Sequence, residues 1–394
     1  MTPTLLCIAT YRKGDDFLRE CRRQGCRVLL LTDEKLAGSD WPREAIDDTF
    51  YVRRDMSESD IRKGAAFLAR TQRLDHIVAL DDFDVEMAAM LREYLNVPGM
   101  GQTTARGFRD KLAMRTRARA AGIPVPAFVH ALHHETIAEW TRSHAAPWVL
   151  KPRSQAAAIG IRKIASDEEL WRTLEGLADT QADFLLEQFL PGDVYHVDSI
   201  VFDGRLRFAK ASRYRMPPMA VAHEGGIFVT STLRDDDPRA VALRELNERV
   251  LTSFGLRRGA SHTEFIQAQD GRWYFLETSA RVGGAYIVDV VEAASGLNLW
   301  REWAKVEVAA DSYDPPVDRG WDAGIVLSLA RQEWPDLSAY QDAEIVNRIK
   351  RLHHAGLVVA SAGDGRVPQL LDEYVARFQH DFHASAPPPE RPLD

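Results

Sequence analysis

The first hundred residues alternate short apolar runs with segments whose apolar residues recur at helical spacing. The runs predict strands at 5–10, 27–33, 47–52 and 76–82. The helical spacing predicts helices at 15–25, 57–68 and 85–95. Such alternation is typical of a parallel, doubly wound sheet, which binds ligands beyond the carboxyl ends of its strands. Asp81, Asp82 and Asp84 follow the fourth predicted strand and are expected at that edge.

The turn after the first predicted strand argues against a dinucleotide cofactor. It reads ATYRKGDD and lacks the Gly-x-Gly-x-x-Gly sequence that lets a backbone approach a pyrophosphate. Gly99 and Gly101 follow a predicted helix instead of a strand, so they do not supply this signature. We therefore expect a doubly wound sheet without a bound dinucleotide.

The pattern changes after a predicted helix within 107–126, which Gly122 closes. From 127 onward, short β-like segments and hairpins dominate, with helices near 135–143, 167–177 and 239–254, which indicates an α+β region. The predicted divisions are an N-terminal Rossmann-like domain, a two-lobed domain with its small lobe at about 124–190, a C-terminal extension and a Pro-rich disordered tail. Their respective ranges are 1–106, 107–310, 311–384 and 385–394.

Composition narrows the class of protein. The 394 residues hold 50 Lys and Arg against 58 Asp and Glu, a net charge of −8, whereas general nucleic-acid binders usually present a basic face. No stretch approaches the roughly 20 apolar residues that a membrane helix needs. The first residues do not read as a secretory signal. The expectation is a cytoplasmic protein without nucleic-acid or membrane partners, whose three cysteines are buried thiols.

The segment 261–284 carries the clearest chemistry. Glu264 and Glu277 lie on consecutive predicted strands joined by a turn at Asp270-Gly271. Antiparallel pairing can bring the two carboxylates together, and like charges held close are costly unless a cation lies between them. Mg²⁺ prefers such oxygen ligands and commonly binds substrate phosphates as well. The alternative is a surface hairpin with solvated acids.

The residues that follow this hairpin have the properties of an anion-binding site. Arg281 lies four positions beyond Glu277 and could stabilise charge on a transferring phosphoryl group. Gly283 and Gly284 permit close approach of the backbone before a predicted helix N-terminus. Together they predict a place for a phosphate or carboxylate next to the paired acids.

Two earlier segments each allow a functional and an ordinary interpretation. Lys151 ends an apolar strand before a loop of small residues, and could bind phosphate beneath a flap or simply be solvated. An apolar strand leads through Glu187 to Leu190 and a Pro-Gly turn. This stretch could offer backbone groups to an adenine edge, or could be merely a strand and a turn.

Residues 207–229 are candidates for binding a second substrate. Arg213 could hold a carboxylate as a bidentate fork, while Glu224 could attract an amine, with His223 beside it. The alternative is a solvated loop with one structural arginine. His262 either orients a metal ligand or is a hydrogen-bonded strand histidine.

In their order along the chain, these segments resemble the ATP-grasp superfamily over roughly 1–310, and its biotin-carboxylase-like branch with the L-amino-acid ligases most of all. The resemblance makes 1–106 a pre-ATP-grasp domain and 107–310 the ATP-grasp domain. It implies that ATP is bound by two lysines, by one acid and by the connector, which is the stretch from Glu187 to Leu190. It also implies that three residues of the hairpin bind the metal. The ATP-binding residues are Lys111, Lys151, Glu187, Gln188, Phe189, Leu190 and Asp193, and the metal ligands are Glu264, Glu277 and Ser279.

Three departures from the family pattern bear on the site. Ser279 stands where the family usually has Asn, and a hydroxyl is a poorer metal ligand than an amide oxygen. The flap contains only Gly160, although the family's flap is usually richer in glycine. In strict register the acid expected near the ribose is Val194, and Asp193 could take its place.

The resemblance implies a carboxylate–amine ligase that activates a small carboxylate as an acyl phosphate, couples it to an amine and releases ADP and phosphate. Lys151 and Arg281 would act on the transferred phosphate, and Arg213, His223, Glu224, Gly283 and Gly284 would bind substrate. The cofactors would be ATP and Mg²⁺, which Mn²⁺ could replace. Such enzymes occur as monomers or dimers, so a homodimer is left open. The alternatives are a biotin-dependent carboxylase, although the chain has no Ala-Met-Lys-Met segment, and a catalytically weak ATP-binding regulatory protein.

Overall fold

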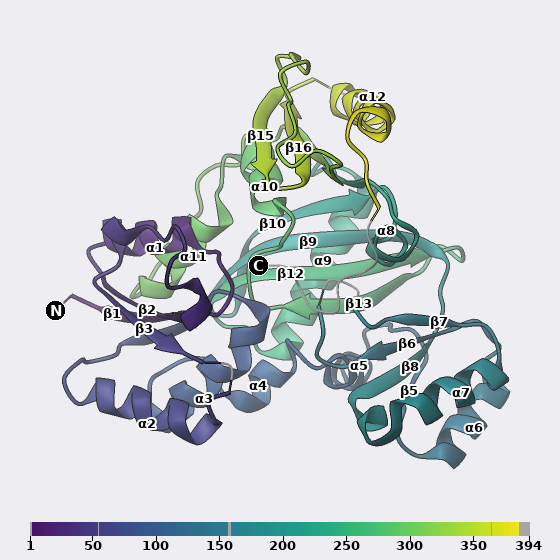
Figure 1. Cartoon of the computed structure of the whole chain (residues 1–394), viewed down its shortest axis with the longest axis horizontal. Coiled ribbons are helices and arrows are strands. Elements are labelled where there is room, and N and C mark those ends of the chain that lie inside the picture. The colour runs from purple at the N-terminus through teal and green to yellow at the C-terminus, as the bar shows by residue number, and fades with distance from the viewer. Residues whose placement is uncertain (1, 54, 157–158, 364, 386–394) are drawn as a thin grey trace.

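The computed structural model describes residues 2–53, 55–156, 159–363 and 365–385, without the side chains of 222–224. The described chain forms three sheets (Figure 1). A four-stranded N-terminal sheet lies at the left of the view, and a second four-stranded sheet, the small lobe, lies at the lower right. An eight-stranded sheet lies between and above them and carries the C-terminal strands at the top. The predicted combination of a parallel N-terminal sheet with an ATP-grasp-like α+β region is confirmed.

The N-terminal sheet has the order β3-β2-β1-β4, and all of its strand pairs are parallel. Its strands are β1 (Thr4–Ala9), β2 (Arg27–Asp33), β3 (Asp48–Val52) and β4 (His76–Ala79). Its helices are α1 (Asp15–Arg23), α2 (Glu58–Ala69), α3 (Val85–Leu95) and α4 (Gln102–Arg106), with short 3₁₀ turns at Glu34–Leu36, Arg43–Ala45 and Asp82–Asp84. The last turn begins three residues after the end of β4, so the aspartates lie at the carboxyl edge of the sheet, where the sequence predicted them.

The small lobe is an antiparallel sheet of order β5-β8-β6-β7. Its elements are β5 (Phe128–His130), α6 (His134–Ser143), β6 (Trp148–Pro152), β7 (Arg162–Ile164), α7 (Asp167–Leu177), a 3₁₀ turn (Ala178–Asp183) and β8 (Phe184–Gln188). Trp148, Leu150 and Leu186 belong to its buried core. The β6–β7 hairpin corresponds to the predicted flap, of which Ala157 and Ala158 lie outside the described residues.

The helix that precedes the small lobe is α5 (Lys111–Ala120), which is shorter than the segment predicted to contain it. Asp110 ends the preceding loop because its carboxylate accepts hydrogen bonds from the backbone N–H groups of Leu112 and Ala113. This is an N-cap, which satisfies donors that have no partner within the helix. Lys111 is therefore fixed at the first turn of α5.

The large sheet is antiparallel, with the order β13-β12-β9-β10-β11-β14-β16-β15. Its strands are β9 (Gly192–Phe202), β10 (Arg205–Tyr214), β11 (Phe228–Thr232), β12 (Gly259–Ala268), β13 (Trp273–Ser279), β14 (Asp322–Leu329), β15 (Ile345–Arg351) and β16 (His354–Ser361). Its helices are α8 (Pro218–Glu224), α9 (Pro238–Phe254), α10 (Ile287–Ser295), α11 (Leu299–Val308) and α12 (Arg366–Asp381). Because β14 pairs with β11, the C-terminal segment extends the same sheet as the candidate site. The proposed domain boundaries stay predictions, and 386–394 of the predicted tail lie outside the described residues.

One hydrophobic core joins the N-terminal sheet to the large sheet. It includes Leu5 from β1, Phe17 from α1, and Ile287 and Trp303 from the helices α10 and α11. The rings of Phe17 and Trp303 meet edge to face, with centroids 5.1 Å apart. The three cysteines are buried free thiols, as predicted. Within the described chain, every helix is too short or too polar to cross a bilayer.

Candidate active site

Glu264 on β12 and Glu277 on β13 are direct partners in the antiparallel ladder. Side chains directly opposite each other have Cβ atoms about 4.5–5.5 Å apart, so both carboxylates share one face of the hairpin. The next pair, Thr263 and Thr278, faces the other way and joins its hydroxyls at 2.8 Å. The predicted meeting of the two glutamates is confirmed by this register.

Lys111 connects the hairpin to the base of the flap. Its Nζ lies 2.8 Å from Glu277 Oε2 and donates to the carbonyl of Gln155 at 2.6 Å. Burial raises the pKa of Glu277, but the attraction of Lys111 outweighs it and lowers the pKa to about 2. Arg109 adds a second link by donating to the carbonyl of Ser154 at 2.6 Å. Lys111 was predicted only as an ATP-binding residue, and its contact with Glu277 was not predicted from the sequence.

Lys151, Glu187 and Arg115 form a buried cluster of charges between the small lobe and α5. The Glu187 carboxylate pairs with Lys151 Nζ and with the Arg115 guanidinium, and Arg115 also donates to the carbonyl of Leu276 on β13. Burial lowers the pKa of Lys151 to about 8, although Glu187 opposes this shift. Sequence reasoning missed Arg115, but it lies four residues after Lys111 and therefore on the same face of the helix.

The predicted adenine connector begins in this cluster. Glu187 and Gln188 end β8, and the Gln188 amide donates to the carbonyl of Ala145 at 2.8 Å. The backbone N–H of Phe189 donates to Pro147, and Lys163 Nζ lies 4.1 Å from the centre of the Phe189 ring. Leu190 packs on a small apolar cluster of the large sheet. Their binding to a nucleotide stays a prediction.

Asp193 was predicted to bind the ribose of ATP and Arg213 a substrate carboxylate, but in the structure the two side chains form an ion pair with each other. Arg213 Nη2 lies 2.8 Å from Asp193 Oδ2, and both side chains are about half exposed. The predicted ribose acid and the predicted carboxylate fork therefore occupy one place on the neighbouring strands β9 and β10. His223 and Glu224 belong to α8, and their side chains lie outside the described part of the chain.

Arg281 reaches the N-terminal sheet. Its Nε and Nη2 atoms lie 2.7 and 2.5 Å from Asp82 Oδ2, and Nη1 donates to the carbonyl of Val282. Burial raises the pKa of Asp82, but Arg281, Arg109 and Lys13 outweigh it and lower the pKa to about 2. Asp82 Oδ1 is buried and has no hydrogen-bond partner among the described residues. The sequence placed Asp82 at the sheet edge but did not indicate this partner.

The loop between β13 and α10 holds the remaining predicted residues. Ser279 ends β13 opposite His262. Gly283 is buried, and a Cβ built on it would lie 2.8 Å from Asp198 Oδ1 and 3.1 Å from His262 Nδ1. Gly284 is exposed and faces open space. The lack of a side chain at Gly283 therefore lets the loop that carries Arg281 lie directly on β9 and β12.

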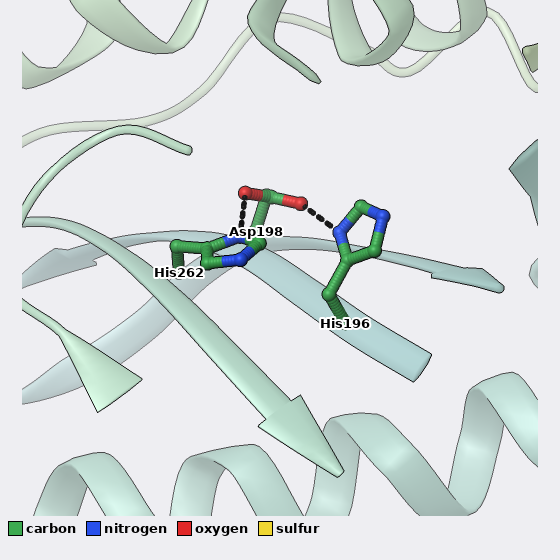
Figure 2. A group of neighbouring side chains, drawn as sticks. All are labelled: His196, Asp198 and His262. Carbon is green, nitrogen blue, oxygen red and sulfur yellow. Dashed lines mark hydrogen bonds and ion pairs between the residues drawn. The ribbon is translucent and has the colours of Figure 1, made fainter. Parts of the chain in front are cut away.

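Beneath that loop, His196, Asp198 and His262 form a buried cluster that the sequence analysis did not assemble (Figure 2). Asp198 lies between the two rings, with 2.6 Å from Oδ2 to His196 Nδ1 and 2.9 Å from Oδ1 to His262 Nδ1. Burial lowers the pKa of His262, but Asp198 and Glu264 outweigh it and raise the pKa to about 9. A signal for part of the cluster was available, because positions two apart on a strand share a face.

Comparison with known proteins supports the family. Residues 144–289 match the family model of the ATP-grasp domain. The chain is 26% identical over 272 residues to the L-arginine-specific L-amino acid ligase of Bacillus subtilis. It is 24% identical over 295 residues to the D-alanine–D-alanine ligase of Anaeromyxobacter sp. strain K, of which it covers 94%. The match over residues 144–289 identifies an ATP-grasp domain in this part of the chain and confirms the resemblance seen in the order of its motifs.

The sequence alignments cover a smaller share of the chain than the structural superpositions do. The first alignment covers 67% of this chain and 65% of the Bacillus subtilis protein, so the chain spans just under two thirds of that relative. The crystal structure of an L-amino acid ligase from Bacillus licheniformis superposes with a TM-score of 0.77 and 16% identity, over 97% of this chain and 98% of that one. An ADP complex of N5-carboxyaminoimidazole ribonucleotide synthetase gives a TM-score of 0.71 at 13% identity, over 97% and 98% of the two chains. Both likenesses establish the fold.

Proposed function

We propose that the protein is an ATP-dependent carboxylate–amine ligase that forms an acyl phosphate and releases ADP and phosphate. The observation that carries this proposal is the meeting of Lys111 with Glu277, which the β12–β13 ladder places opposite Glu264. The buried ammonium of Lys151 also acts electrostatically on Glu277 and helps to lower its pKa. Relatives that are amino-acid ligases support an amino acid or a similar small acid as substrate.

Glu264 and Glu277 fit a divalent cation. Both are carboxylates on one face of a hairpin, and Glu277 is ionised because Lys111 lowers its pKa to about 2. Hard cations such as Mg²⁺ prefer oxygen ligands of this kind. Ser279 is the proposed third ligand, with Mn²⁺ as a substitute metal. When bound, the ion would neutralise charge on the phosphates of ATP.

The lysines are suited to hold the triphosphate. Lys111 and Lys151 are 7% exposed, and each pairs with a glutamate, Lys111 with Glu277 and Lys151 with the buried Glu187. Arg115 neutralises Glu187, and Glu187 in turn fixes Lys151. Catalysis of phosphoryl transfer depends on positioning and charge neutralisation more than on a protein nucleophile. The chain offers such positioned cations, with the connector from Glu187 to Leu190 and Asp193 proposed for the adenosine.

The proposed reaction has two steps. A carboxylate oxygen of the first substrate bonds to the γ-phosphorus, and the bond from that phosphorus to the β–γ bridging oxygen breaks, so ADP leaves. The amine then bonds to the acyl carbon and loses a proton, and phosphate leaves with the electrons of the C–O bond. Arg281, held by Asp82, is proposed to stabilise the phosphoryl oxygens. Arg213, Gly283 and Gly284 are proposed to contact the substrates, together with His223 and Glu224.

The direct test is phosphate release from ATP and Mg²⁺ in the presence of pooled amino acids and other small carboxylic acids, with products identified by mass spectrometry. Substrate-dependent release together with an amide product supports the ligase. Tight ATP binding without turnover on any pool would instead favour a regulatory protein. Turnover that depends on bicarbonate and biotin would favour a carboxylase.

Matched variants make that assay specific. Lys151→Ala should weaken ATP binding at least tenfold in calorimetry, because a buried phosphate contact is lost. Lys350→Ala removes an exposed lysine on β15 and should leave affinity unchanged. Glu277→Gln should abolish turnover, whereas Glu168→Gln, at an exposed pair with Arg172, should not. Normal turnover of Glu277→Gln would remove this residue from the proposed metal site.

A further inference from the structure

The buried cluster of His196, Asp198 and His262 has no part in the proposed chemistry so far. Asp198 uses a different oxygen for each ring, and it is fully buried. His196 also bonds through Nε2 to the hydroxyl of Thr230 at 2.8 Å. Both oxygens of the carboxylate and both nitrogens of His196 thus have hydrogen-bond partners.

This arrangement is that of a hydrogen-bonded chain. A metal held by two histidines and an aspartate would require a nitrogen from each ring and a carboxylate oxygen to face one common point. One ligand atom from each of the three residues lies within 4.8 Å of the others, so a bound metal is the alternative to a hydrogen-bonded chain. In Figure 2 the carboxylate lies between the rings, and each dashed line joins one ring to its own oxygen. These hydrogen bonds therefore hold neighbouring side chains in place.

The far side of the His262 ring points towards the proposed metal ligand. His262 Nε2 lies 3.5 Å from Glu264 Oε1, and the Tyr214 hydroxyl donates to the same oxygen at 2.9 Å. Both ring nitrogens of His262 thus face carboxylate oxygens, Nδ1 towards Asp198 and Nε2 towards Glu264. Among the described residues, these contacts of Glu264 fall on Oε1, which leaves Oε2 as the oxygen to face a cation.

The same pair of residues also supports the loop that carries Arg281. A methyl group at Gly283 would come within 2.8 Å of Asp198 Oδ1 and within 3.1 Å of His262 Nδ1. The loop backbone at Gly283 therefore packs directly against the two atoms that form the hydrogen bond between Asp198 and His262. The hydrogen bond between Asp198 and His262 thus adjoins two parts of the candidate site. One is β12, which carries Glu264, and the other is the loop that carries Arg281.

We propose that Asp198 and His262 form a positioning pair that, with Tyr214, holds Glu264 Oε1 so that Oε2 faces the divalent cation. This inference rests on the proposed function, because it takes Glu264 as a metal ligand. Asp198 fixes the ring of His262, and His262 acts through Glu264 without touching substrate. Hydrogen-bond partners behind a metal ligand typically change metal affinity by about 10–100-fold when they are removed.

The test measures Mn²⁺ binding by electron paramagnetic resonance in the presence of a non-hydrolysable ATP analogue, so that no turnover is needed. We expect Asp198→Asn and His262→Asn to raise the Kd for Mn²⁺ about 10–100-fold. Tyr214→Phe keeps the ring and should give a smaller rise. The double variant of Asp198 and His262 should bind no more weakly than the weaker single variant, because both act through one contact.

A matched control separates positioning from general damage to the sheet. Ser199 also lies on β9, is buried and bonds to Asn247 at 2.7 Å, but its side chain is on the other face. Ser199→Ala should lower the melting temperature and leave the Kd for Mn²⁺ within twofold of the wild-type value. If Asp198→Asn does not fold, His262→Asn decides the question in its place, because it removes the ring that faces Glu264 Oε1.

The outcomes distinguish this inference from the proposed function. If the wild-type protein binds Mn²⁺ with the nucleotide and Asp198→Asn and Tyr214→Phe both bind it within twofold as well, the positioning pair is overturned and the ligase proposal stands. A tightly bound transition metal that copurifies and is lost with His196→Ala would also overturn it. If the wild-type protein binds no Mn²⁺ with the nucleotide, both proposals fall together.

Discussion

Asp82 and Arg281 lie 199 positions apart in the chain and form a partly buried ion pair, with 2.7 Å between Arg281 Nε and Asp82 Oδ2. The pair joins the carboxyl edge of the N-terminal sheet to the loop after β13. It holds the guanidinium beside the hairpin of Glu264 and Glu277 and makes the N-terminal sheet part of the candidate active site.

We predict that Asp82→Asn lowers kcat/KM for ligation about 100-fold, because small displacements of a positioning group can cost that much in rate. The affinity for ATP should stay within twofold, since the lysines that would hold the triphosphate are unchanged. Steady-state phosphate release and calorimetry measure the two effects. Asp15→Asn, at the partly exposed pair with Arg12, is the control and should retain activity. Full activity of Asp82→Asn would show that Arg281 needs no help from the N-terminal sheet.

ATP binding should weaken as the pH rises through about 8. Burial lowers the pKa of Lys151 to about 8, so the free protein loses the positive charge of this residue above that pH. Bound phosphates favour the charged form, and binding above pH 8 should therefore take up a proton. Calorimetry in two buffers of different ionisation enthalpy measures that uptake directly.

Lys151→Arg supplies the control for this pH dependence. Arginine keeps its charge at every accessible pH, so the variant should bind ATP with an affinity that changes little between pH 7 and 9. An equally steep decline in wild-type and variant proteins would assign the titration to another group.

Glu187→Gln should lower the free energy of unfolding by about 3–5 kcal/mol, because it leaves the buried cations Arg115 and Lys151 without their shared counter-charge. Denaturant unfolding measures the loss. Glu168→Gln breaks an exposed pair and should cost at most about 1 kcal/mol. A similar small loss in both variants would mean that the buried cluster adds little to stability.

The stability of Asp84→Asn relative to the wild-type protein should increase as the pH rises. Burial raises the pKa of Asp84 to about 7, although hydrogen bonds from Thr10 oppose this. In the unfolded chain the same carboxyl ionises near pH 4. The stability gained from the neutral buried form is therefore complete below about pH 4 and is lost as the pH rises through 7.

Asparagine stays neutral throughout, so the difference in melting temperature between Asp84→Asn and the wild-type protein should shift in favour of the variant between pH 4 and 7. Thermal unfolding at intervals of half a pH unit follows this difference. Parallel curves for the two proteins would contradict the raised pKa.

Patterns of neighbouring residues were enough to predict several helices and strands and one contact of the site. The helices 85–95 and 167–177 match α3 and α7, because helical periodicity and capping depend on neighbouring residues. The pairing of Glu264 with Glu277 was also predictable, since a short turn at Asp270-Gly271 restricts the register of its two strands.

The pairing of charges that are distant in the chain could not be predicted and depends on how the elements pack. Arg115 pairs with Glu187 across 72 positions, Asp82 with Arg281 across 199, and Asp198 with His262 across 64. With 50 Lys and Arg and 58 Asp and Glu in the chain, residue type alone does not select a partner. The packing of α5, the N-terminal sheet and β9 against the hairpin selects it, because a buried charge must find its counter-charge where the folded backbone places one.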